Sequence, residues 1–415
     1  MQAIPFHILC QFLNTLEMVQ LAQTNRYNKS LTYKSASPNV QISSTSMGLH
    51  IMKIFPKVNL DGRELLNPSD SDVHLLKRLK WFSLYCGGYS HNTGDGLSVL
   101  TNLVDLTLTD LSSKHLTASA LHNLINLTSL TIFESHGIKD DALTRLVSLK
   151  KLELNHTSIQ GTCLAFFENL TSLRVASRKF LPLAEPMNLT NLETLEIDET
   201  DRHPHNADPP DPIIHPSRIR DNLFRMLTKL TALTIDIHSE SSANITDYGL
   251  STLHNLTQLR IGSTNTLTNR CFIHLTNLKC LEIMECPEIT DEGISHLKYL
   301  THIMFDTTNI TGSCFSSFVA LDTLDINSCD IISDKDISHL KLRDFRLFDC
   351  PHVTDAGINS LTNLTRLTIY NDDDQYSDAA IKSLDKLKKL TIYGGDQKYD
   401  IAALKLRGIE IYRRI

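Results

Sequence analysis

The chain has no long hydrophobic run and no excess of positive charge. Its 415 residues contain no stretch of 18 consecutive apolar residues, so we expect no transmembrane helix and no membrane contact. Lys and Arg number 40 against 47 Asp and Glu, a net charge of -7, which argues against a nucleic-acid partner because such proteins carry a basic footprint. The amino terminus lacks a basic segment and an A-x-A cleavage site. We therefore expect no secretory signal and a cytoplasmic or nuclear protein.

Cysteine pairs and catalytic motifs are also missing. The nine cysteines are odd in number and none forms a C-x-x-C pair, which favours reduced, mostly buried thiols and argues against zinc. The chain has no P-loop, no G-x-G-x-x-G, no H-E-x-x-H and no G-x-S-x-G. We therefore expect a protein that is not an enzyme and that binds no metal or cofactor.

A single repeated pattern dominates the sequence. L-x-x-L-x-L, with Ile, Val or Phe allowed, occurs sixteen times between Phe55 and Leu406, mostly at spacings of 21 to 26 residues. This period is typical of leucine-rich repeats. In each unit a short strand turns both leucines of L-x-L inward, and the chain returns as a short helix. We predict an α/β leucine-rich-repeat solenoid over 46–415, with a curved parallel sheet on the concave face and short helices on the convex face.

The return segments and the turns carry their own signals. Thr246-Asp247, Thr290-Asp291 and Thr354-Asp355 each precede an apolar i, i+3 pattern, as expected of a helix start with its N-cap and an acidic first turn. Cysteine stands at the turn in three units, and with the Ile-Thr-Asp segments these units resemble the cysteine-containing class of leucine-rich repeats. We expect buried turn residues there in preference to reactive thiols. The three are Cys286, Cys329 and Cys350.

The repeat pattern is interrupted by one insertion, and it also contains several glycosylation sequons. Residues 199–217 lengthen one spacing to 38 residues and contain five prolines, which predicts an extended loop. The loop holds His203, His205 and His215 near several aspartates; a metal site there is the alternative to a solvated, partner-contacting loop. The chain also has nine N-x-S/T sequons, five of them in the string Asn-Leu-Thr. The repeat explains that string, so we favour it over glycosylation.

Residues 1–45 do not follow the repeat. Two short amphipathic helices are expected, over 4–13 and 16–28, the first with proline near its start. The segment resembles an F-box: a Pro-x-x-Ile-Leu start, a Phe-Leu pair, an acidic-apolar helix, then Asn-Arg before an aromatic residue. The resemblance implies a small helical trio that binds a Skp-type adaptor and, through it, a cullin. A helical cap over the first repeat is the other interpretation. The implied adaptor-binding residues are Pro5, Ile8, Leu9, Phe12, Leu13, Leu16, Val19 and Leu21.

The residues that flank the inward leucines should point onto the concave face. The position after each L-x-L is aromatic in the last four repeats, and cations stand nearby. Aromatic residues beside cations are typical of protein-binding hot spots, although aromatics are also common on strands. The predicted substrate-binding residues are Arg346, Phe348, Arg366, Tyr370, Lys389, Tyr393 and Tyr412. The middle of the array is acidic, through Glu153, Glu196, Asp198, Asp236, Glu282, Asp306 and Asp325.

An F-box followed by leucine-rich repeats is an arrangement found in substrate receptors. We therefore expect a substrate-recognition subunit of an SCF-type ubiquitin ligase that holds a target protein on its concave face and acts by proximity. One alternative is an interaction scaffold with no role in ubiquitin transfer. A second is a surface or secreted adhesion protein.

Overall fold

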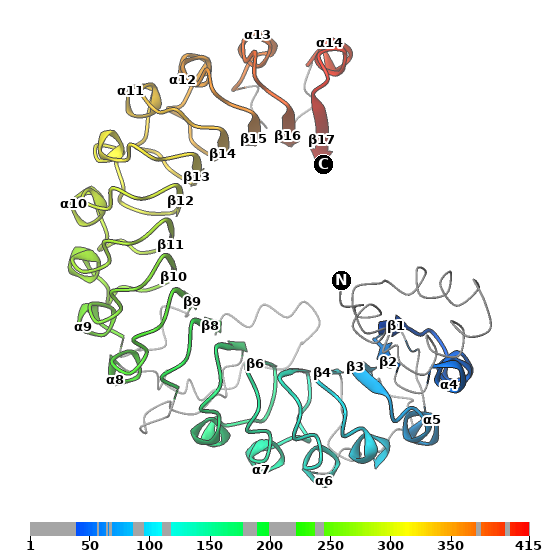
Figure 1. The fold of residues 1–415 in the computed structure, drawn as a ribbon. Helices are drawn as coiled ribbons and strands as arrows, with labels where there is room; N and C mark the ends of the chain where they lie inside the picture. Colours follow the sequence, from blue (N-terminus) through cyan, green and yellow to red (C-terminus); the bar gives the residue numbers. More distant parts are fainter. Residues whose placement is uncertain are drawn as a thin grey trace, which may run out of the picture. The chain divides into compact units, whose positions relative to one another are not determined.

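A computed structural model describes most of the chain between Asn39 and Arg414 (Figure 1). The described residues are 39–55, 58–63, 65, 69–85, 95–109, 118–176, 189–198, 221–236, 245–370, 375–394 and 399–414. The F-box-like residues from Pro5 to Leu21 and the insertion at 199–217 lie outside them.

The chain divides into two compact units, Met1–Leu192 and Glu193–Ile415. In unit 1 the described strands pair in parallel in chain order. They are β1 (Asn39–Gln41), β2 (Asn59–Gly62), β3 (Leu79–Tyr85), β4 (Asp105–Thr109), β5 (Ser129–Phe133), β6 (Lys151–Asn155) and β7 (Ser172–Ala176). The helical returns are α4 (Thr45–Ile54), α5 (Asp70–Leu75), η1 (Asp95–Val99), α6 (Ala118–Leu121), α7 (Asp140–Leu143) and η2 (Thr162–Phe166).

Unit 2 repeats this arrangement, again with parallel pairs in chain order. Its strands are β8 (Thr194–Asp198), β9 (Ala232–Asp236), β10 (Gln258–Gly262), β11 (Cys280–Met284), β12 (His302–Asp306), β13 (Thr323–Asn327), β14 (Asp344–Phe348), β15 (Arg366–Tyr370), β16 (Lys389–Tyr393) and β17 (Glu410–Arg414). Its helical returns are α8 (Asp221–Phe224), α9 (Asp247–Leu250), η3 (Asn269–Phe272), α10 (Asp291–Ile294), η4 (Phe315–Ser317), α11 (Asp334–Ile337), α12 (Asp355–Ser360), α13 (Asp378–Lys382) and α14 (Ile401–Leu406).

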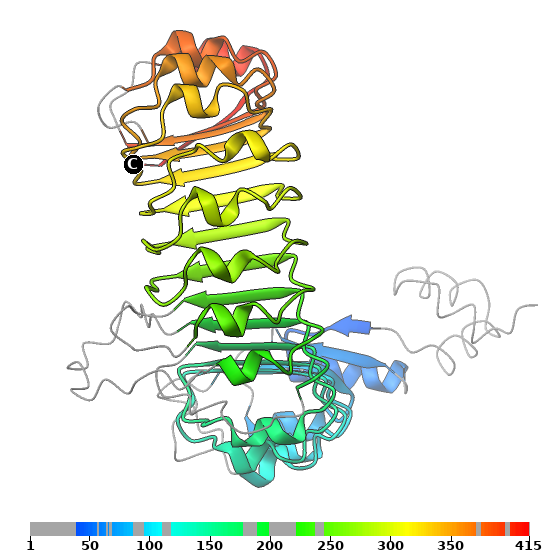
Figure 2. The ribbon, with the colours of Figure 1, turned by 90° about the vertical axis from the view of Figure 1, so that its left-hand side faces the viewer.

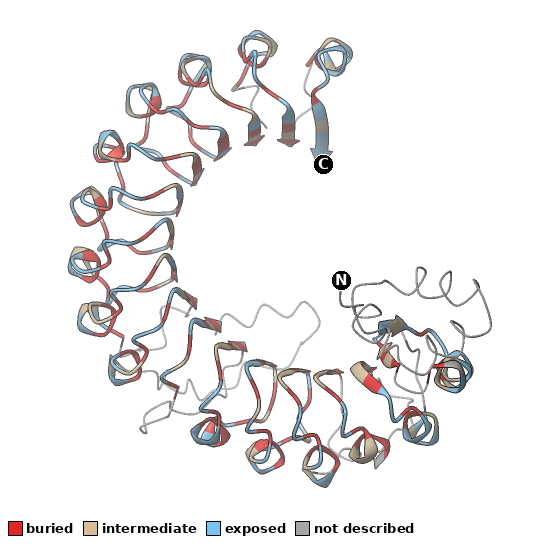
Figure 3. Ribbon diagram, in the orientation of Figure 1, coloured by how far each residue is buried: buried red, intermediate tan, exposed pale blue. Residues whose placement is uncertain are grey.

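The core lies between the strands and the helical returns, as the alternation in L-x-L requires. Leu324 and Ile326 of β13 are fully buried, and Ile337 of α11 is buried behind them. Figure 3 shows buried residues gathered on the facing sides of strands and helices. In unit 2 the strands line the inner side of an arc and the short helices its outer side, each helix stacked on the next (Figure 2). The predicted leucine-rich-repeat solenoid is confirmed.

Aspartates at the helix starts clamp each repeat to the next one. Asp334 accepts hydrogen bonds from the backbone N–H of Thr354 at 2.7 Å and from its hydroxyl at 2.6 Å, one repeat further along. The sequence predicted only the N-cap hydrogen bond within each helix. In α12 this bond is present, because the Thr354 hydroxyl accepts from the N–H of Ala356. The same clamp to the next repeat recurs at Asp140, Asp221, Asp247, Asp291, Asp355 and Asp378.

The string Asn-Leu-Thr serves the stacking of repeats. Asn255 Nδ2 donates to the carbonyl oxygen of Thr228 at 2.8 Å, and the Thr257 hydroxyl donates to that of Thr231 at 3.1 Å. Asn126 and Asn169 donate in the same way to the repeat before them. The repeat thus accounts for these sequons, because the amide nitrogen that a glycan would modify is engaged in a hydrogen bond between repeats.

The predicted turn cysteines are all buried, and two of them are hydrogen-bonded through sulfur. The Sγ of Cys350 donates to the carbonyl oxygen of Phe348 at 3.1 Å, and Cys286 makes the same contact with Met284. Burial raises the pKa of Cys286 to about 11 and that of Cys350 to about 12, so neither thiol is ionised near neutral pH. Among the described residues no cysteine is disulfide-bonded.

The ladder of strands begins earlier than the repeat pattern indicated. Asn39–Gln41 forms β1, which pairs with β2, so the sheet of unit 1 starts within the stretch that the sequence assigns to the helical segment.

In the described part of the chain, no helix is long and apolar enough to cross a membrane, and no group of three or more His, Cys, Asp or Glu side chains is placed to hold a metal ion.

Candidate functional site: the concave face of unit 2

Each strand of unit 2 presents three outward positions, and the parallel register lines them up in three columns across the sheet. The last column follows the second inward residue of each strand, and it holds Asp236 on β9, Met284 on β11 and Asp306 on β12. It continues through Asn327 on β13 and Phe348 on β14. This column therefore carries acidic residues at one end and aromatic residues at the other.

The aromatic residues predicted at the end of this column do meet. Phe348 packs on Tyr393 with ring centroids 5.4 Å apart and on Tyr370 at 6.5 Å, while Tyr370 and Tyr393 face one another across β15 and β16. We call these three residues the aromatic cluster. Tyr370 keeps 41% of its surface exposed, and Phe348 and Tyr393 are half-buried, so aromatic surface stays accessible on the concave face, as in the hot spots of protein interfaces.

The predicted place of Tyr412 in this column is wrong. Tyr412 pairs with Thr391, in the middle column, and Arg414 takes the position opposite Tyr393. The sequence interpretation took Ile409-x-Ile411 as the inward pair of the last strand. Ile409, however, precedes β17, and Ile411 pairs with Leu390, which is the first inward residue of β16. The second inward position therefore falls on Arg413. Tyr412 instead lies under the Lys389 ammonium, whose nitrogen is 4.7 Å from the ring centroid.

Two of the predicted cations, Arg346 and Arg366, are held by aspartates, whereas the third, Lys389, lies over Tyr412. Arg366 Nε donates to Asp344 at 2.9 Å, and Arg346 lies 3.7 Å from Asp344 and 3.8 Å from Asp325. The Asp344 side chain is 5% exposed, whereas both arginine side chains are at least half exposed. The guanidinium groups therefore stay in reach of a ligand while a buried carboxylate fixes their positions.

Carboxylates crowd the middle of the sheet. Glu282, Asp306 and Asp325 stand on the neighbouring strands β11, β12 and β13, and we call them the acidic patch. Burial raises the pKa of Asp325 to about 6; Arg346 opposes the shift, while Asp344 and the other two carboxylates of the patch add to it. A carboxylate whose ionised form is disfavoured on a concave surface is a candidate binding residue.

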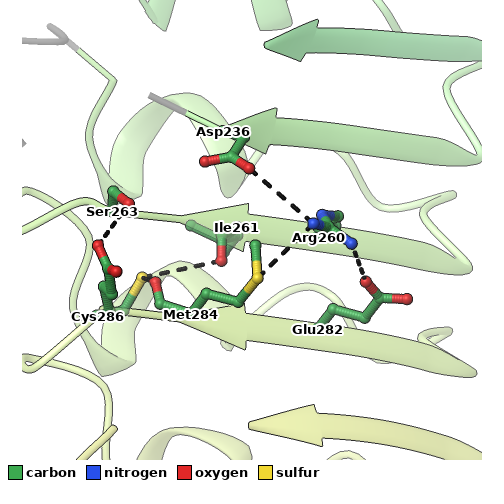
Figure 4. Close-up of polar contacts among 8 residues, drawn as sticks. Asp236, Arg260, Ile261, Ser263, Glu282, Met284 and Cys286 are labelled. Atoms are coloured by element: carbon green, nitrogen blue, oxygen red, sulfur yellow. Dashed lines mark hydrogen bonds and ion pairs between the residues drawn. The ribbon is translucent and has the colours of Figure 1, made fainter. Parts of the chain in front are cut away.

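Arg260 on β10 is held at the margin of this patch (Figure 4). Its guanidinium donates to Glu282 at 2.8 Å and lies 4.0 Å from Asp236 and 3.7 Å from the sulfur of Met284. The two carboxylates come from the strands on either side of β10. Arg260 therefore neutralises one edge of the patch and leaves Asp306 without an ion pair among the described residues.

The sequence interpretation did not single out Asp344 or Arg260. Both occupy outward positions of L-x-L strands, so aligning every outward residue of neighbouring repeats would have found them. The predicted acidic residues do lie on outward positions of their strands; Glu153 belongs to unit 1, where it pairs with Lys151 at 3.2 Å. The proposed adaptor-binding residues from Pro5 to Leu21 lie outside the described part of the chain.

Comparison with solved structures agrees with this architecture. A leucine-rich-repeat protein of Leptospira interrogans superimposes with a TM-score of 0.51 at 17% identity, over 90% of this chain and 99% of its own. The functional domain of InlJ from Listeria monocytogenes, described as including a cysteine ladder, gives 0.46 at 19% identity over 78% of this chain and 69% of its own. The internalin InlF of Listeria monocytogenes gives 0.40 at 21% identity, over 71% and 82%. No family model matches the chain, and no curated protein matches its sequence. Of these three structures, the Leptospira protein alone has a TM-score above 0.5, and its similarity to this chain is a similarity of fold.

Proposed function

We propose that this leucine-rich-repeat solenoid is a non-catalytic interaction scaffold that binds a protein on the concave face of unit 2. The observation that carries the proposal is the juxtaposition of the aromatic cluster with the acidic patch on neighbouring strands. Open aromatic surface and a carboxylate with a raised pKa both cost stability in a protein that only has to fold, which favours a binding role. Leucine-rich repeats offer such a sheet as a wide, rigid surface.

Capture from cell extract with matched variants tests the scaffold. Tyr370→Ala/Tyr393→Ala removes two rings from the concave face, and Tyr248→Ala/Tyr299→Ala removes two exposed rings, 58% and 64% exposed, from the convex segments. We expect proteins that are retained by the unmodified chain and by the convex variant and lost by the concave variant. Melting temperatures check that both variants are folded. Equal capture by all three chains would overturn the proposal.

The F-box resemblance of residues 1–45 supports a finer proposal, that the bound protein is a ubiquitination target. In that role the chain would join a Skp-type adaptor and a cullin in the cytoplasm or nucleus. The support is the sequence pattern alone. A purified Skp-type adaptor tests it by pull-down with the full chain, with residues 1–38 deleted so that β1 is kept, and with Leu9→Asp/Leu13→Asp.

The matched control for that experiment is Gln11→Asp/Asn14→Asp, which adds the same charge at polar positions of the same segment. We expect binding by the unmodified chain and by the control, and loss in the deletion and in the leucine variant. Failure of the intact, folded chain to bind the adaptor would leave the scaffold as the function, without a role in ubiquitin transfer.

A further inference from the structure

We propose that the partner of the concave face is an extended, positively charged protein segment with one apolar anchor residue, lying across the strands of unit 2. The inference rests on the function proposed above and adds the chemistry of the partner. It follows from three features of the described residues: the charge of the acidic half of the sheet, the place of the aromatic cluster and the distance between the two.

The charge of β8 to β13 is strongly negative on the concave side. The outward carboxylates are Glu196, Asp198, Asp236, Glu282, Asp306 and Asp325, and the same outward positions hold a single arginine, Arg260. Crowded carboxylates of like charge raise one another's energy, and lysine or arginine from a partner relieves this. A nucleic acid or an acidic protein segment would be repelled here. A second copy of this chain, with its net charge of -7, suits the surface poorly for the same reason.

Asp306 shows most directly that this half of the sheet has too few cations for its carboxylates. Its carboxylate accepts hydrogen bonds from two neutral groups, the Thr307 hydroxyl at 2.9 Å and Asn327 Nδ2 at 2.9 Å. Neither donor carries a charge, so the Asp306 carboxylate has hydrogen bonds but no cation to neutralise it among the described residues. A lysine or arginine of a partner would supply that charge.

The apolar anchor follows from the aromatic cluster. Phe348, Tyr370 and Tyr393 belong to the same column as Asp306, so one segment running along this column meets both. Arg346 and Arg366 stand on the same strands as Phe348 and Tyr370 but in other outward columns, and Asp344 already pairs with both. An apolar or aromatic side chain therefore gains more at the cluster than an acidic one, which would have to compete with Asp344.

The strand spacing sets the distance between the two kinds of contact. Asp306 on β12 is three strands from Tyr370 on β15, and Glu282 on β11 is four strands away. At about 4.8 Å per strand this is roughly 14–19 Å. An extended segment covers about 3.4 Å per residue. The basic residues of the partner should therefore stand about four to six positions from its anchor.

Selection from a random peptide library tests this chemistry without assuming a partner. A phage-displayed library of peptides of about 16 residues, long enough to cover the site, is selected on the full chain, with prior removal of phage that bind the Tyr370→Ala/Tyr393→Ala variant. We expect the selected peptides to carry net positive charge, with Lys or Arg about four to six positions from an aromatic or large aliphatic residue. A synthetic peptide with this consensus should bind more weakly as salt is added.

Charge-only variants then locate the basic contacts. Glu282→Gln/Asp306→Asn keeps the hydrogen-bonding atoms, and Glu288→Gln/Glu292→Gln removes the same charge from exposed positions away from the concave face. We expect the consensus peptide to bind the first variant at least about tenfold more weakly, or ~1.4 kcal/mol, and the second unchanged.

The outcomes separate this inference from the proposed function. Concave-dependent peptides that are acidic or uncharged would overturn the basic partner while leaving the scaffold intact. An equal effect of both charge variants would also overturn it, because a general field of the protein would then explain the binding. If no selected peptide depends on the concave face, the inference fails, and the capture experiment decides the scaffold on its own.

Discussion

Asp325 shows how a single side chain combines the structural and the proposed binding role of the concave face. Burial and the carboxylates of Asp344, Glu282 and Asp306 disfavour its charge, and Arg346 at 3.8 Å only partly compensates. Its pKa of about 6 is well above that of an ordinary aspartate. The folded chain therefore holds a proton on Asp325 at pH values where the unfolded chain has lost it.

This proton makes the contribution of Asp325 to stability depend on pH. Because the pKa is raised from 3.8 to about 6, the contribution falls as the pH rises between these values and stays low above them. Asp325→Asn should stabilise the protein at pH 7.5 by about 1 kcal/mol, after allowing for solvent screening, and have little effect near pH 4. Urea unfolding at the two pH values measures the difference. An equal effect at both would show that folding does not raise the pKa of Asp325.

At the scale of the element, the clamp between repeats determines which residues the short helices accept. Gly357 in α12 is buried, and a Cβ there would lie 2.2 Å from Asp334 Oδ1, the atom that accepts from Thr354. Gly293 is in the same position with respect to Asn269, at 2.4 Å. The glycine in the helix is therefore required by the aspartate or asparagine of the repeat before it, and local helix propensity would have preferred alanine.

A double-mutant cycle on Asp334 and Gly357 tests this dependence. Asp334→Ala removes both hydrogen bonds to Thr354, and Gly357→Ala forces the carboxylate out of place; each should cost about 1–3 kcal/mol of unfolding free energy. The double variant should cost less than the sum by about 1 kcal/mol, because the Cβ then fills the space that the carboxylate leaves. Chemical denaturation supplies the four values. Simple additivity would mean that the two residues do not share this space.

At the scale of the whole molecule, stability passes from repeat to repeat. Each strand pairs with the strands of the neighbouring repeats, and the aspartate clamps and the Asn-Leu-Thr hydrogen bonds also join neighbours in sequence. In such an array the effect of a change is greatest in the repeats next to it.

The variant Leu324→Ala tests whether a local change destabilises mainly the neighbouring repeats. Leu324 on β13 is fully buried, and its truncation should cost about 2–5 kcal/mol locally. Hydrogen exchange followed by mass spectrometry should show faster exchange in β12, β13 and β14 and unchanged protection in β4 to β6 of unit 1. Uniformly faster exchange in both units would instead mean that the chain opens as one cooperative body.

The repeat pattern was enough to predict the strands, the short helices and the buried cysteines, since each depends on residues close together in one unit. It also placed Phe348, Tyr370 and Tyr393 in one column. It misplaced Tyr412, because the spacing before β17 is irregular and two apolar pairings of Ile409 and Ile411 fit the pattern equally well. Only the hydrogen-bonded register with Lys389 and Leu390 distinguishes them.

The sequence by itself determined the solenoid, because a period of 21 to 26 residues with paired inward leucines leaves no other way to bury the apolar face of each unit. The tertiary structure alone decided which outward residues meet. Asp334 reaches Thr354, Asp344 holds Arg366, and Glu282 holds Arg260 across strands whose residues are some twenty positions apart. Such contacts depend on the register between repeats, which is set by the packing of whole neighbouring units and is not encoded in any one of them.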